Sequence, residues 1–389
     1  MNTLSNLSVL RSLAGVPLLS AFARWRGQEN DETLKAEFLS LLFRADAQDD
    51  FTAYVTRLIL CDENPFSRTC AADRPVSPYL FRAYLHDLGM IQSLLAACPS
   101  DLFAVGTGKE IFSGNWDCEE TGKRLSDFYR ANGYGQYIYH RAFRYDETDG
   151  LRPILSPSEI TLNDLKGYEH EKEEVRDNLE NFVSGLPFAD MLLYGDRGTG
   201  KSSTVHAMVN EFAPRKLRLV EIAKEDILSL PALKNRLASI PLRFIVFIDD
   251  FSLAENDERF STLKAALQGS MEGHADNVMI IATSNRRHIV EETFDTRSNS
   301  VHSGDSEQEL LSLSDRFGIT VLFSTTNKAE YLSIVHALAD DAKLKTDRAE
   351  LDTLAERWAL LKGGRSPRRA RQFIDYAIAS ERKGKQINV

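Results

Sequence analysis

A short glycine-rich string carries the clearest chemistry in this sequence. It reads Gly-Asp-Arg-Gly-Thr-Gly-Lys-Ser, begins at Gly195 and follows an apolar run at 191–194. In such a loop, consecutive backbone N–H groups can surround a phosphate, and the next helix adds the positive end of its dipole. Lys201 is expected to reach the β- and γ-phosphates, and the Ser202 hydroxyl to ligate Mg²⁺. The residues predicted to bind the phosphates of a nucleotide are Gly195, Asp196, Arg197, Gly198, Thr199, Gly200, Lys201, Ser202 and Ser203.

Two adjacent carboxylates, Asp249 and Asp250, end a second apolar run at 243–248. Carboxylates at the C-terminal ends of parallel strands face the ligand crevice of an α/β sheet. Asp249 is expected to complete the coordination of Mg²⁺, and Asp250 to polarise an attacking water. An Asp-Asp pair alone would fit a strand-to-loop turn equally well, but its place after the glycine-rich loop favours the catalytic interpretation.

Two further polar residues adjoin later apolar runs. Asn285 follows the run at 278–283 and is placed to hold a water against the γ-phosphate; the alternative is that it only caps the exit of the strand. Arg316 precedes the run at 319–323, at the far edge of the expected sheet, from which it could reach the γ-phosphate of a neighbouring subunit. The alternative is a surface ion pair with Asp315, worth roughly 0 to 1 kcal/mol.

An arginine cluster at 365–371 begins the last expected helix, with Ser366 suited to the N-cap and Pro367 to the first helical position. Four arginines at a helix start oppose the helix dipole, so an anion is needed to compensate them. A γ-phosphate, the acidic face of a partner and nucleic acid all qualify.

The apolar runs predict the elements that position these residues. Most of them are too uniformly apolar for half-exposed antiparallel strands, and helical patterns lie between them, which indicates βαβ units in a five-stranded parallel sheet. Helical patterns dominate residues 1–155 and recur at about 328–342, 349–362 and 367–382. We therefore predict a mainly helical domain over 1–155, an α/β core over 156–325 and a helical lid over 326–389, with the first boundary near Pro153 and Pro157.

Taken in order, the motifs resemble those of an AAA+ ATPase module: Walker A, Walker B, sensor 1, arginine finger and sensor 2. The stretches at 192–203, 282–288 and 313–318 are similar to the bacterial AAA+ family catalogued as DUF815, whose function is poorly defined. The resemblance implies ATP and Mg²⁺ as cofactors, Asn285 as sensor 1, and Arg316 as a finger acting in trans. It also implies that residues 165–169 line the adenine pocket and that Arg368 is sensor 2, with Arg365 and Arg371 as rivals.

The sequence departs from the AAA+ pattern at two places. Asp250 stands where most AAA+ proteins carry glutamate, and the missing methylene shortens its reach by roughly 1.5 Å, a misplacement that can cost about 10²-fold in rate. Residues 223–242 contain no aromatic residue and no glycine, so the pore loop typical of protein-threading members is missing. These departures favour a slow or switch-like ATPase that acts as a loader, clamp or assembly factor.

Three functions follow from these patterns. The first is an oligomeric ATPase that remodels, loads or assembles a macromolecular partner through residues 1–155; the second is a nucleotide-gated binding or scaffold module with slow hydrolysis. The third is a nucleic-acid-associated factor, suggested by Arg286, Arg287 and the basic lid, although the net charge of −10 opposes it. We also expect a cytoplasmic location with reduced cysteines and no membrane segment, and a mobile insertion over 291–309.

Overall fold

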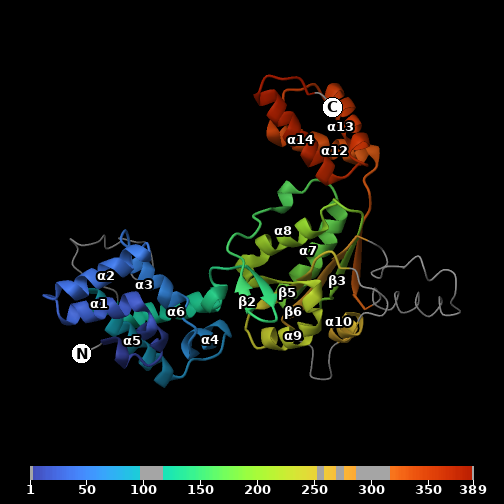
Figure 1. The fold of residues 1–389 in the computed structure, drawn as a ribbon. Coiled ribbons are helices and arrows are strands. Elements are labelled where there is room, and N and C mark those ends of the chain that lie inside the picture. The colour runs from blue at the N-terminus through green and yellow to red at the C-terminus, as the bar shows by residue number, and fades with distance from the viewer. Residues whose placement is uncertain (1–2, 97–116, 252–257, 269–275, 286–315, 388–389) are drawn as a thin grey trace. The chain divides into compact units, whose positions relative to one another are not determined.

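The computed structural model describes residues 3–96, 117–251, 258–268, 276–285 and 316–387 (Figure 1). The chain divides into two compact units. Unit 1 comprises Met1–His140 and Ile240–Leu242, and unit 2 comprises Arg141–Ser239 and Arg243–Val389. Each unit is described by itself.

Unit 1 is helical over its described residues. Aspartate or asparagine side chains cap several of its helices by accepting hydrogen bonds from first-turn N–H groups, as at Asp31 and Asp50. Its α-helices are α1 (Pro17–Gly27), α2 (Glu32–Arg44), α3 (Phe51–Leu60), α4 (Pro65–Ala71), α5 (Pro78–Ala96) and α6 (Cys118–Asn132).

Aromatic side chains fill the core of unit 1. The rings of Phe38 and Phe51 lie 5.1 and 5.0 Å from that of Phe22, measured between centroids. A buried carboxylate ties down the start of the chain, because Asp87 accepts hydrogen bonds from the backbone N–H groups of residues 8–10. The predicted helical character of this region therefore rests on packing as well as on capping.

Unit 2 is built on a seven-stranded sheet with the order β2-β1-β4-β5-β6-β3-β7. All neighbouring strands are parallel except β1 and β2. The strands are β1 (Ala142–Asp146), β2 (Gly150–Pro153), β3 (Met191–Gly195), β4 (Leu217–Ile222), β5 (Arg243–Ile248), β6 (Val278–Ser284) and β7 (Ile319–Phe323). The predicted fold class, a mostly parallel α/β sheet with C-terminal helices after a helical region, is confirmed.

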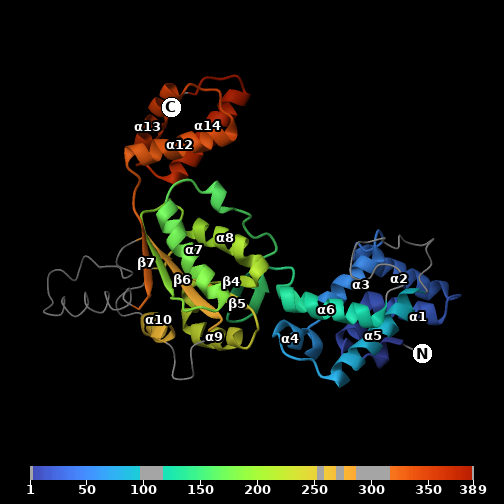
Figure 2. The same ribbon diagram turned by 180° about the vertical axis from the view of Figure 1, so that it is seen from behind.

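Helices cover the sheet on both faces. Alternate strand residues such as Leu193, Phe247 and Ile281 pack with α7 (Glu169–Ser184) and α8 (Lys201–Phe212) in one buried core. Helix α9 (Leu230–Ala238) packs against β6 and against α10 (Glu258–Gln268) on the side away from α7 and α8 (Figures 1 and 2). Burial on two faces explains why the strands read as continuous apolar runs.

The strand pair β1–β2 differs from the predicted organisation. We predicted five strands and a first boundary at residue 155, but β1 pairs in parallel with β4, with Phe143 opposite Val220. These two strands belong to unit 2, and the division between the units falls at His140 and Arg141. The cause is long-range pairing with β4, which the short and partly polar strands do not reveal locally.

Three helices form the lid that follows β7: α12 (Lys328–Ala342), α13 (Arg348–Leu361) and α14 (Pro367–Arg382). They begin at capping residues, among them Asn327 with a reciprocal bond from Glu330 and Ser366 ahead of Pro367. Their facing sides share a small core that includes Tyr331 and Phe373. The lid thus has its own packing and presents the start of α14 to the sheet.

Candidate functional site

The glycine-rich loop joins β3 to α8 and uses its glycines for left-handed backbone. Gly195, Gly198 and Gly200 have φ values of +129°, +81° and +105°. A Cβ atom at Gly195 would lie 2.1 Å from the carbonyl oxygen of Phe323 on neighbouring β7, so no side chain fits there. The first N–H groups of α8 have no acceptor within the helix, so the loop and the helix start together have the geometry of an anion-binding site.

Lys201 is 6% exposed, and its ammonium group lies under the loop. It donates hydrogen bonds to the carbonyl oxygens of Gly195 and Asp196 at 2.9 and 2.8 Å and to Asn285 Oδ1 at 3.2 Å. Burial lowers the pKa of Lys201, and the Arg368 guanidinium lowers it further, while three nearby carboxylates act in the opposite direction. An anionic ligand here would raise this pKa and so favour the charged form.

Ser202 and Asp249 provide a pair of oxygen ligands at the end of the loop. Ser202 Oγ donates a hydrogen bond to Asp249 Oδ1 at 2.6 Å. A hydroxyl and a carboxylate are the ligands that Mg²⁺ takes beside phosphate oxygens, and these two lie close enough to bind one ion side by side. The donor set therefore fits the magnesium predicted for this position.

Asp250 and Asn285 meet across the ends of β5 and β6. The Asn285 amide Nδ2 donates a hydrogen bond to Asp250 Oδ1, while its Oδ1 accepts from Lys201. Asp250 has a left-handed backbone, with φ of +48°, so the chain turns sharply where β5 ends. One amide thus connects the lysine of the loop to the carboxylate that is predicted to polarise water.

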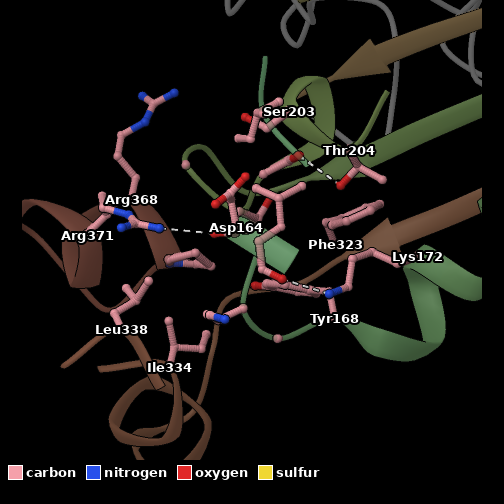
Figure 3. Close-up of a pocket in the computed structure, with 18 of the residues that line it drawn as sticks. Asp164, Tyr168, Lys172, Ser203, Thr204, Phe323, Ile334, Leu338, Arg368 and Arg371 are labelled. Atoms are coloured by element: carbon pink, nitrogen blue, oxygen red, sulfur yellow. Dashed lines mark hydrogen bonds between the residues drawn. The ribbon is translucent and has the colours of Figure 1, made fainter. Parts of the chain in front are cut away.

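A cavity of about 250 Å³ lies beside the loop, between the sheet and the lid (Figure 3). Residues 164–168 form one wall, the glycine-rich loop another, and the lid helices α12 and α14 close it. The predicted adenine segment thus lines the cavity through residues 165–168. Its apolar wall consists of Leu165, Tyr168, Phe323, Ile334 and Leu338.

The three rival arginines at the start of α14 lie in different places. Arg365 makes a bidentate ion pair with Glu356 inside the lid, with N–O distances of 2.9 and 2.7 Å. Arg371 lines the cavity and donates to the carbonyl oxygen of Asp164 at 3.1 Å (Figure 3). Arg368 lines the cavity as well, one helical turn before Arg371.

Helix α14 also touches the loop through its backbone. The Arg368 N–H donates to the carbonyl oxygen of Gly198 at 3.1 Å. A Cβ atom at Gly198 would lie 3.2 Å from Arg368 Cβ and 3.3 Å from Ser366 Oγ, so the lid packs tightly on this glycine. Of the three rivals, Arg368 therefore fits the predicted sensor position best.

A second contact links the loop to the hinge of the lid. The Asp196 N–H donates to the Phe323 carbonyl oxygen at 3.1 Å, and its carboxylate accepts from the Thr325 N–H at 3.1 Å. The Tyr168 hydroxyl donates to the carbonyl oxygen of Ser324 at 2.5 Å. The segment that leads from β7 into the lid is thus held from both sides.

Arg316 lies at the opposite end of the sheet from the loop. Strand β7 runs parallel to β3, with Ile319 opposite Met191 and Phe323 opposite Gly195, so a residue before Ile319 lies beyond the start of β3. Five residues of strand span about 16 Å at about 3.3 Å per residue, which separates Arg316 from the phosphate loop of its own chain. This position suits a contact with another subunit.

Two further residues predicted to bind the phosphates lie in different surroundings. Arg197 is exposed and does not line the cavity, whereas Ser203 lines it. Arg286 and Arg287 and the predicted insertion at 291–309 lie outside the described residues.

Sequence reasoning missed four residues around the cavity and the carboxylates. They are Asp164, Lys172, Thr283 and Phe323. Of these, Thr283 had a recognisable signal, because it is a hydroxyl at the end of an otherwise apolar run. The others come from segments far apart in the sequence and gave none.

The mostly parallel sheet, the glycine-rich loop after β3, the polar ends of β5 and β6 and the C-terminal lid together form one α/β unit with its polar residues at one edge of the sheet. Residues 138–381 match the family described as "Protein of unknown function (DUF815)". This match covers more than half of the chain, and the chain belongs to the DUF815 family.

Solved structures similar to this one include two AAA+ proteins. The RuvB Holliday junction branch migration motor of Thermotoga maritima is 18% identical with a TM-score of 0.41, covering 59% of this chain and 68% of that chain. The FIGL-1 AAA domain in complex with ADP is 21% identical with a TM-score of 0.40, covering 59% and 76% respectively. No curated protein matches the chain.

Among the residues that the structure describes, no helix is both long and apolar enough to cross a membrane. The same residues contain no cluster of three or more His, Cys, Asp or Glu side chains suited to a metal ion.

Proposed function

We propose that this protein binds ATP with Mg²⁺ and hydrolyses it as an AAA+ ATPase. The observation that carries the proposal is the convergence of Lys201, Asn285 and Asp250 at one edge of the sheet, linked by hydrogen bonds. The loop N–H groups and Lys201 would bind the phosphates, and Ser202 and Asp249 would hold Mg²⁺, which supplies charge stabilisation when bound. Asp250 would accept a proton from water, and Asn285 would orient that water.

The cavity beside the glycine-rich loop supports a nucleotide as the ligand rather than a simple phosphate. Its apolar wall suits the face of a base, and it opens directly onto the glycine-rich loop. Arg368 would add positive charge near the γ-phosphate from the lid. Lid position would then depend on which nucleotide is bound.

We also propose that the protein works as an oligomer. Arg316 is too far from the loop of its own chain to act there, so it would serve a neighbouring active site. Residues 1–155 would bind the macromolecular partner that the ATPase remodels, loads or assembles. Two arginines of the cluster, Arg365 and Arg371, make contacts within the protein, so they are less available to nucleic acid than the sequence alone suggests.

Nucleotide binding and phosphate release by the purified protein test the proposal. Lys201→Ala is expected to abolish both, because it removes the charge under the loop, and Lys383→Ala is the matched control at an exposed position of the lid. Asp250→Asn is expected to keep binding and to lose hydrolysis. Phosphate release that is equal in wild type and Lys201→Ala would refute the proposal.

A second function is favoured by Asp250 itself. Its short side chain is engaged by Asn285 and follows a left-handed turn, so hydrolysis could be slow enough for ATP to act mainly as a switch that stabilises an assembly. Turnover far slower than nucleotide release, together with ATP-dependent oligomerisation of Asp250→Asn, would support it. Fast turnover that disappears in Asp250→Asn would count against it.

A further inference from the structure

Thr283 contacts both aspartates of the site, the carboxylate of Asp249 and the backbone of Asp250. It lies near the end of β6, is 2% exposed, and follows five buried apolar residues of the same strand. Its hydroxyl donates a hydrogen bond to Asp249 Oδ1 at 2.5 Å and accepts one from the Asp250 N–H at 2.9 Å. A threonine hydroxyl has one proton and two lone pairs, so it can serve both partners at once.

The backbone of Thr283 extends the same contact by one residue. Its carbonyl oxygen accepts a hydrogen bond from the Phe251 N–H at 2.7 Å, and Phe251 is fully buried. This register follows from the parallel pairing of β5 with β6, in which Ile248 lies opposite Ala282. Thr283 therefore holds three consecutive residues at the point where β5 ends.

The turn that Thr283 contacts has an energetically unfavourable backbone conformation. Asp250 has φ of +48°, a conformation that residues other than glycine adopt at a cost. The hydroxyl of Thr283 satisfies the N–H of Asp250 in this turn, and the same hydroxyl fixes the carboxylate of Asp249. One side chain thus couples the orientation of the predicted magnesium ligand to that of the predicted base.

We propose that Thr283 is a positioning residue that sets both carboxylates for Mg²⁺ binding and for hydrolysis. The proposal rests on the proposed ATPase function. Thr283 is not among the residues that line the cavity, and its hydroxyl contacts Asp249 and Asp250, so we expect it to act through these two residues. Loss of the hydroxyl should therefore spare Mg²⁺-free nucleotide binding and impair the steps that need the two carboxylates.

Three variants separate the hydroxyl from the methyl group. Thr283→Val removes only the hydroxyl, Thr283→Ser removes only the methyl, and Thr283→Ala removes both. We expect Thr283→Val and Thr283→Ala to lower kcat by about 10²-fold, the usual effect of a misplacement of about 1 Å, and to need more Mg²⁺ for half-maximal activity. Thr283→Ser should stay within about threefold of wild type in kcat, since its hydroxyl can make both hydrogen bonds.

The measurements are steady-state ATPase kinetics and the affinity for a fluorescent ATP analogue in Mg²⁺ and in EDTA. Thr320→Val, at an exposed position of β7, is the matched control for the Thr→Val change. The affinity for the ATP analogue in EDTA shows whether a variant is folded, and it should be unchanged in every variant that folds. If Thr283→Val does not fold, Thr283→Ser and Thr283→Ala are compared instead. Mg²⁺ should raise affinity in wild type and in Thr283→Ser, and much less in Thr283→Ala.

The proposal is overturned if the variants that lack the hydroxyl match Thr283→Ser in kcat and in Mg²⁺ dependence. It is also overturned if Mg²⁺ does not alter nucleotide affinity in wild type, since no metal ligand is then being positioned. A wild type that binds nucleotide more tightly with Mg²⁺ but releases no phosphate refutes hydrolysis instead. In that case, the effect of Thr283→Ala on Mg²⁺-dependent binding still decides the proposal.

Discussion

Replacement of Asp196 with alanine tests whether the phosphate loop holds the lid hinge. The carboxylate accepts a hydrogen bond from the Thr325 N–H at 3.1 Å, while the backbone bond from Asp196 to Phe323 is independent of the side chain. The substitution therefore removes one contact between loop and hinge. It leaves the strand pairing of β3 with β7 in place.

The size of the effect follows from the exposure of this bond. Hydrogen bonds contribute about 0.5–1.5 kcal/mol net, and the groups here are exposed, so we take about 1 kcal/mol. That is about a fivefold shift from the closed toward the open lid. Other contacts still hold the lid, among them the ion pair of Lys166 with Asp341, the bonds that Arg368 and Arg371 donate, and the bond from the Tyr168 hydroxyl to Ser324.

The assay is the distance distribution between the sheet unit and the lid. Labels introduced as non-natural amino acids at the exposed positions Glu174 and Lys383 report on it without use of the native cysteines. In Asp196→Ala we expect a larger open fraction and faster nucleotide release, by at most about fivefold. Asp177→Ala, an exposed aspartate of α7, is the matched control. Equal distributions and release rates in the two variants would refute the role of the Asp196 carboxylate.

Three other predictions follow from the site. Arg316→Ala and Lys201→Ala proteins, each inactive alone, should regain part of the ATPase activity when mixed, and no recovery at any ratio would exclude a finger acting in trans. Gly195→Ala should abolish nucleotide binding and lower the thermal midpoint, because its Cβ would lie 2.1 Å from the Phe323 carbonyl oxygen at a φ of +129°; binding at wild-type affinity would contradict this. Since burial lowers the pKa of Lys201, the unfolded chain binds more protons above that pKa, so the stability of the nucleotide-free protein should rise with pH in that range. ATP affinity should fall over the same range, and titrations of wild type and Lys201→Arg at several pH values would show whether this residue causes the fall.

Local patterns predicted the core of the fold well. The five apolar runs became β3 to β7 within one residue at either end, because strands buried on both faces must be apolar throughout. The three lid helices were also located closely, since each carries a helical apolar period and follows a capping residue. The glycine-rich loop was also located from the sequence, because the strand before it, the loop itself and the helix after it are contiguous in the chain.

Long-range pairing explains what the sequence did not reveal. Strands β1 and β2 are four or five residues long, contain arginines and end at Pro153, so they resemble a loop until β4 pairs with them. The cavity likewise unites residues 164–168 with two lid helices that lie more than 150 positions away. No local pattern carries such contacts.

The arginine cluster shows how geometry divides residues that look equivalent in sequence. Arg368 and Arg371 are three positions apart and so share one face of α14, the face that lines the cavity. Arg365 precedes the helix and turns back to Glu356. The ion pair with Glu356 thus compensates one of the four arginine charges near the start of this helix, and Arg368 is the arginine whose backbone contacts the glycine-rich loop.

The aspartate at position 250 is better understood from its backbone than as a shortened glutamate. Left-handed φ is several-fold more accessible to aspartate and asparagine than to most other residues with a side chain. Asp250 adopts that conformation, its N–H is bound by the Thr283 hydroxyl, and its carboxylate reaches Asn285. A glutamate at this position would extend its carboxylate further, but the left-handed backbone conformation is less accessible to glutamate than to aspartate. The departure from the AAA+ pattern at residue 250 and the hydroxyl at residue 283 are therefore parts of one arrangement, in which the turn after β5 carries the carboxylate to the site.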